Sequence, residues 1–85
     1  MEMKLDIPEY DSKNGLPSHW SPGFAITVAG VANEMHIKAN KEGLISLAVQ
    51  LLTLAQDDVP IGRHYHYDEH TCLEDGSMGL VVEKV

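Results

Sequence analysis

The chain has 85 residues, of which 44 % are hydrophobic, and a formal net charge of -7 at pH 7. We expect a single domain over residues 1–85, because a chain of this size buries only about 60 % of its unfolded surface and supports one core. The acidic excess repels phosphate groups, which disfavours a nucleic-acid partner and favours a basic one. No apolar run reaches the roughly 20 residues of a membrane span, so no membrane partner is expected.

Two features predict a cytoplasmic location. Cys72 is the only cysteine, so no internal disulfide can form, whereas small secreted domains usually contain several. Residues 1–6 lack the basic start and the apolar stretch of a secretory signal.

The N-terminal half contains three predicted strands and a long loop. Residues 3–7 alternate apolar and polar side chains, the pattern of a half-buried strand. Residues 9–23 hold two prolines, two glycines and several polar turn formers, which predict a long loop. Residues 24–29 and 33–38 predict two further strands, joined by a short turn at Gly30.

A helix is predicted over residues 40–56. Asn40 is a favourable N-cap, Glu42 lies in the first turn, and apolar residues recur at helical spacing from Leu44 to Ala55. The apolar residues are too many for one narrow stripe. We therefore expect the helix to lie across a sheet and also to touch the long loop or another subunit.

The C-terminal part predicts two strands, at residues 63–68 and 79–84, with a loop between them. The alternation of the first strand places His64, His66 and Asp68 on one face and Arg63, Tyr65 and Tyr67 on the other. The whole order is then β-β-β-α-β-β. It predicts an α+β fold, in which one α-helix packs on one face of an antiparallel β-sheet.

Four potential ligands of zinc or copper lie close together in the sequence: His64, His66, His70 and Cys72. They suggest an alternative function, that of a small metal-binding domain. No Cys-x-x-Cys or His-Glu-x-x-His spacing accompanies them. The simpler interpretation is that the histidines face solvent, so no metal or cofactor is expected.

Catalysis through Cys72 is not expected. A thiolate nucleophile needs a neighbouring imidazole, which His66 or His70 could supply. However, the neighbouring residues are acidic and disfavour the thiolate, and no oxyanion-hole loop is evident. We therefore expect a protein that is not an enzyme.

Five motifs in the second half of the chain resemble a known family. They are Asn40-Lys41-Glu42-Gly43-Leu44, the spacing of Leu47-Ala48 and Leu51-Leu52-x-Leu54-Ala55, the strand His64-x-His66-x-Asp68, Leu73-Glu74-x-Gly76-Ser77, and Leu80-Val81-Val82-Glu83-Lys84. Over roughly residues 40–85 the chain resembles the immunity protein 32 family of bacterial polymorphic toxin systems. The resemblance implies a small α+β protein that binds and neutralises a cognate toxin.

A toxin partner would be held by aromatic anchors and attracted by acidic groups. The expected contact residues are Trp20, Tyr65, Tyr67, Asp68, Glu69, Glu74 and Asp75. A third alternative is a homodimer with a structural or scaffolding role, in which a second copy covers the surplus apolar side of the helix.

Overall fold

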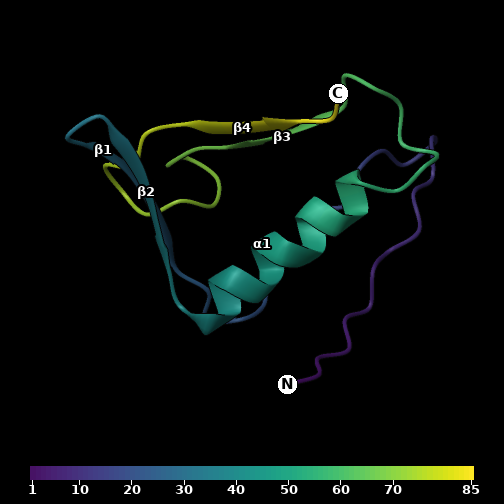
Figure 1. Cartoon of the computed structure of the whole chain (residues 1–85), viewed down its shortest axis with the longest axis horizontal. Coiled ribbons are helices and arrows are strands. Elements are labelled where there is room, and N and C mark those ends of the chain that lie inside the picture. Colours follow the sequence, from purple (N-terminus) through teal and green to yellow (C-terminus); the bar gives the residue numbers. More distant parts are fainter.

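Two β-hairpins and one helix form the regular structure of this computed structural model, which describes residues 1–85 (Figure 1). The elements are β1 (Ile26–Val31), β2 (Glu34–Ala39), α1 (Lys41–Leu54), β3 (His64–Tyr67) and β4 (Leu80–Glu83). In Figure 1 the β1–β2 hairpin stands at the left, the β3–β4 hairpin runs across the top, and α1 lies below it. The predicted α+β class is confirmed. No helix has both the length and the apolar run needed to cross a bilayer.

The strands form two separate antiparallel pairs, where a single sheet was predicted. The segment before β4 joins the free side of β1: the Glu74 N–H donates to the Ile26 carbonyl at 2.9 Å, and the Met78 N–H donates to the Val28 carbonyl at 2.9 Å. The strand predicted over residues 3–7 does not form. An alternating pattern forms a strand only when it pairs with a neighbouring strand, and residues 3–7 pair with none.

Two backbone positions explain the sharp turn between β1 and β2. Ala32 and Asn33 have φ values of 51° and 65°, the left-handed conformation that two-residue hairpin turns require. Asparagine adopts this conformation readily, whereas alanine does so at a cost.

The hydrophobic core is small and draws on every part of the chain. Its fully buried members are Ile26, Val28, Leu54, Val59, Tyr65, Tyr67 and Leu73. Trp20 packs against this core from the long N-terminal loop, stacked on Phe24 and edge-on to Tyr67. Only 11 of the 85 residues are buried, so much of the apolar content remains near the surface.

The start of α1 is bonded to the residue just before β1. The Asn40 side chain caps the helix by accepting from the Gly43 N–H at 2.9 Å, and the same oxygen accepts from the Ala25 N–H at 3.0 Å. At Gly43 a Cβ would lie 2.7 Å from the Ala25 carbonyl oxygen. Glycine is therefore required inside this helix, despite its low helix propensity, because the backbone at Ala25, just before β1, passes so close.

The side of α1 that faces the molecule is largely polar. Ser46, Gln50 and Thr53 are all at most 3 % exposed. The Ser46 hydroxyl accepts from the Ser21 N–H at 2.9 Å, and the Gln50 amide donates to the His19 carbonyl at 3.1 Å. The N-terminal loop thus lies along α1, held by side chains that satisfy its otherwise unpaired backbone groups.

Gln56, just after α1, extends this row of contacts to the start of the loop. Its side chain accepts from the Tyr10 N–H at 3.3 Å and donates to the Pro8 carbonyl at 2.7 Å. Because the loop occupies the polar side of α1, the opposite side of the helix is left to face solvent.

Candidate partner-binding site

The outward side of α1 carries apolar side chains in place of the usual charges. We call it the apolar helix face and define it by residues that recur at helical spacing: Leu44, Ala48, Leu51, Leu52 and Ala55. The three leucines are 53 %, 39 % and 49 % exposed, respectively. No charged residue occurs between Gly43 and Gln56. Solvated helix surfaces normally carry charges, so this face has the composition of a covered surface.

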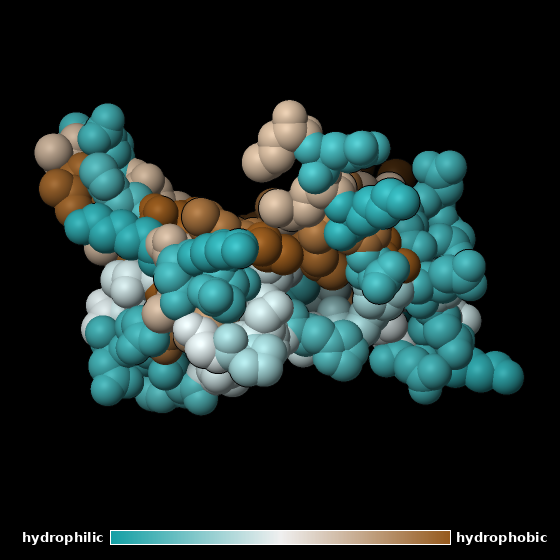
Figure 2. Space-filling view, turned by 90° about the horizontal axis from the view of Figure 1, so that it is seen from below, coloured by the Kyte–Doolittle hydropathy of each residue, from teal (hydrophilic) through white to brown (hydrophobic).

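Figure 2 shows how hydrophobic residues are distributed over one face of the molecule. Brown surface gathers in a band between hydrophilic areas and is hollowed beside the part of the molecule that projects at the left. On β2, Met35 and Ile37 add further apolar surface, at 56 % and 42 % exposure. A contiguous apolar surface on a small protein is a common mark of an interaction site.

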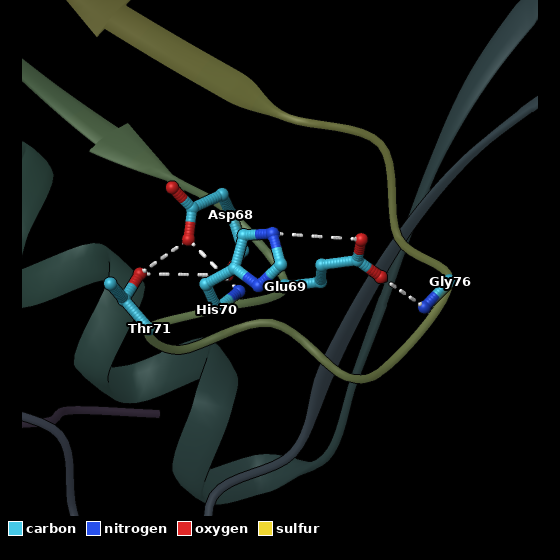
Figure 3. A network of polar contacts seen from close by, with 5 residues as sticks. All are labelled: Asp68, Glu69, His70, Thr71 and Gly76. Carbon is cyan, nitrogen blue, oxygen red and sulfur yellow. Dashed lines mark hydrogen bonds and ion pairs between the residues drawn. The ribbon is translucent and has the colours of Figure 1, made fainter.

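A second candidate surface is the acidic loop, which we define as residues 68–77 and which connects β3 to β4 (Figure 3). Asp68 organises its first turn: the carboxylate accepts from the His70 N–H and from the Thr71 hydroxyl, both at 3.0 Å. The Asp68 carbonyl accepts from the Leu73 N–H at 2.9 Å, and the buried Leu73 side chain anchors the loop in the core.

The same contacts keep Asp68 charged. The hydrogen bond from the Thr71 hydroxyl, followed by that from the His70 N–H, holds the pKa of this carboxyl below its ordinary value. These bonds favour the ionised form, because a carboxylate is a better acceptor than a carboxylic acid. The acidic loop therefore presents a permanent negative charge at Asp68 at neutral pH.

The second half of the loop is closed by Glu69. Its carboxylate accepts from the Gly76 N–H at 2.7 Å, and the exposed His70 ring lies 4.0 Å from its other oxygen (Figure 3). Gly76 has a φ of 85°, which suits glycine at this turn. The side chains of Glu74 and Asp75 are exposed and make no hydrogen bond or ion pair. Asp68 and Glu69 therefore hydrogen-bond within the loop, whereas Glu74 and Asp75 remain free.

The structure separates the aromatic residues expected at a partner surface from the acidic ones. Tyr65 and Tyr67 are 6 % and 2 % exposed and belong to the core. Burial raises the pKa of both phenols, so both stay neutral at physiological pH. Trp20 is half-buried against the same core. The acids Asp68, Glu69, Glu74 and Asp75 share the acidic loop.

The alternation predicted over residues 63–68 holds for the four residues of β3, whereas Arg63 and Asp68 lie outside the strand and Arg63 is exposed. His64 and His66 face solvent, opposite the buried Tyr65 and Tyr67. No three histidine, cysteine or acidic side chains come together in an arrangement that could hold a metal ion. The four residues of the metal alternative, His64, His66, His70 and Cys72, are therefore not brought into one ligand set.

The surroundings of Cys72 do not resemble those of a nucleophile. The residue is half-buried against the core, and its sulfur accepts a long hydrogen bond, 3.7 Å, from the Thr71 hydroxyl. No imidazole hydrogen-bonds to the thiol, so no base is placed to form the thiolate.

Sequence patterns predicted a surplus apolar side on α1, but they did not show which of its residues face outward. Helical spacing shows that one side of α1 is apolar, but it does not show whether that side faces inward. The sequence signal for the inward side is a row of polar residues, Ser46, Gln50 and Gln56. Their side chains bond to the backbone of the N-terminal loop.

These surfaces define a small α+β protein whose exposed features suit binding. Comparison with known proteins gives the family: the family model described as Immunity protein 32 matches residues 34–85, which is more than half of the chain. The chain belongs to the immunity protein 32 family, as the motifs from Asn40 onward predicted, and the match begins at β2. No curated protein and no solved structure matches the chain.

Proposed function

We propose that this protein binds a cognate bacterial toxin in the cytoplasm and neutralises it through protein–protein contact, without catalysis. Membership of the immunity protein 32 family supports the kind of partner. The observation that carries the proposal is the apolar helix face, which exposes three leucines on a helix without a charged residue from Gly43 to Gln56. Burial of such a face against a partner lowers the free energy of the complex.

The size of that gain is sufficient for a central contact. Complete burial of a leucine contributes about 1.5–3 kcal/mol, so covering three leucines that are roughly half exposed contributes on the order of 1 kcal/mol each. Interface energy is usually concentrated in a few buried anchors surrounded by a polar rim. We assign the anchor role to Leu44, Leu51 and Leu52.

The acidic loop supplies the electrostatic part of the proposal. Asp68, Glu69, Glu74 and Asp75 are its proposed contacts, and they would attract a basic toxin surface over a distance of several ångströms. The hydrogen bonds of Asp68 and Glu69 fix the loop before the partner arrives, which reduces the entropy lost on binding. Trp20 contributes the exposed part of its ring. The tyrosines support the surface from within.

The function is tested by capturing the toxin from native cell lysate with this chain as bait, and then measuring inhibition of the purified toxin. Association rates test the role of the acidic loop. Replacing Glu74 and Asp75 together by Gln and Asn should slow association by about threefold to tenfold at low salt and by less at high salt, because screening weakens steering. The dissociation rate should change little.

A matched control removes the same charge elsewhere. Asp57 and Asp58 are exposed beyond the end of α1, and their replacement by Asn lowers the net negative charge equally. If both double variants slow association to the same extent, net charge and not the acidic loop governs encounter, and the contact assignment fails.

A further inference from the structure

The outer edge of β2 is open, and the pattern of its backbone groups can be deduced. β2 pairs with β1 on one side only. The Asn40 N–H donates to the Ala25 carbonyl, so every second residue before it, namely Lys38, His36 and Glu34, also points its backbone groups toward β1. The backbone groups of Met35, Ile37 and Ala39 therefore point outward.

The backbone hydrogen bonds of β1 are consistent with this alternation. On β1, the carbonyls of Ile26 and Val28 point away from β2 and accept from residues 74 and 78. Antiparallel neighbours alternate in the same way on both strands. One edge of this hairpin is thus paired with the chain itself, whereas the other has donors and acceptors without protein partners.

From this edge we infer that a second copy of the chain adds its own β2, antiparallel, with the twofold axis at His36. In that register Met35 lies opposite Ile37 of the second copy. Both residues have outward backbone groups, so each such pair exchanges two N–H···O=C bonds. The exposed Met35 and Ile37 side chains, at 56 % and 42 %, then pack against each other across the axis.

The charges of β2 are complementary in this register. Glu34 and Lys38 lie at equal distances on either side of His36, so Glu34 of each copy faces Lys38 of the other. These are the closely spaced pairs of an antiparallel ladder, in which opposite charges attract. Both side chains are exposed. Two copies of a chain with a net charge of -7 repel each other over most of their surface. At β2 the charges of Glu34 and Lys38 balance, so two copies can approach there without this repulsion.

The surface area of the chain fits an association of this kind. A compact monomer of this mass exposes about 5,000 Å², whereas this chain exposes 6025 Å². A standard interface covers about 800 Å² on each partner. Exposed large apolar side chains occur at the N-terminus, on β2 and on α1.

Sedimentation of the purified chain over a range of concentrations tests the inference without any toxin. The wild type should show a monomer–dimer equilibrium. Glu34→Lys and Lys38→Glu should each raise the dimer dissociation constant about tenfold, because two attractive pairs become repulsive. The double variant E34K/K38E restores opposite charges and should return the constant to within about threefold of wild type.

The two single variants separate pairing from net charge, because Glu34→Lys reduces the negative charge and Lys38→Glu increases it. Lys13→Glu, in the N-terminal loop, serves as the control and should leave the constant within about twofold of wild type. Thermal unfolding checks that all variants are folded. A wild-type chain that remains monomeric at millimolar concentration, or a double variant that stays as weak as the singles, would overturn the inference. A monomeric wild type whose toxin binding is lost in Glu34→Lys would assign the edge to the toxin instead.

Discussion

At the scale of single residues, the two tyrosines of β3 have the same burial and different polar environments. Their rings stack with centroids 5.8 Å apart. The Tyr65 hydroxyl donates to the Pro17 carbonyl at 2.6 Å and so ties β3 to the N-terminal loop. The Tyr67 hydroxyl is buried without a hydrogen-bond partner. Alternation along the strand predicted that both residues share the face opposite the histidines, and the structure shows that this face belongs to the core.

Replacement of each tyrosine by phenylalanine should therefore have unequal effects. Tyr65→Phe leaves the Pro17 carbonyl without its donor and should lower the free energy of unfolding by about 1–2 kcal/mol. Tyr67→Phe removes an unsatisfied hydroxyl and should leave that free energy unchanged or raise it by up to about 1 kcal/mol. Urea unfolding of both variants measures the difference. Equal losses would contradict the different roles assigned to the two hydroxyls.

At the scale of elements, α1 shows where sequence patterns are sufficient and where they are not. Local chemistry predicted its start, because the Asn40 cap involves residues that are close in the chain. The orientation of its faces depends on contacts with distant residues. Leu54 is buried and Leu47 packs on the core, whereas Leu44 and Leu52 face outward. Side-chain bonds to the N-terminal loop decide this orientation, and helical periodicity does not contain them.

Gln56 offers a direct test of that explanation. Gln56→Ala removes the bonds to Tyr10 and Pro8, so the first part of the loop should open more easily. We expect amide exchange at Tyr10 to become about tenfold faster, with a loss of global stability of about 1 kcal/mol. Hydrogen exchange followed by NMR gives both values. Asp57→Ala, the exposed neighbour, is the control, and an unchanged Tyr10 rate in Gln56→Ala would refute the role of this side chain.

At the scale of the whole molecule, the α+β class followed from the order of patterns in the sequence, whereas the division into two hairpins did not. That division depends on residues 74–78, which bond to β1 through two backbone N–H groups and the Ser77 hydroxyl. Hydrophobic periodicity does not indicate bonds of this kind. The candidate site also has a part that could be predicted from the sequence and a part that could not. The acids of residues 68–75 could be predicted because charge is visible in sequence. A surplus apolar side of α1 could be predicted as well, but not which residues form it, since exposure results from how the small core is shared among the elements.

The central claim is that the apolar helix face binds the toxin, and the affinity of a helix-face variant tests it most directly. Leu44→Glu and Leu52→Glu each place a charge on this face at side chains that are about half exposed. Ile61→Glu is the matched control, because Ile61 is an apolar residue that is 79 % exposed outside the helix. Calorimetry with the captured toxin should show dissociation constants raised by at least about tenfold for both helix variants and within about twofold of wild type for the control. Wild-type affinity in Leu44→Glu and Leu52→Glu would contradict the account.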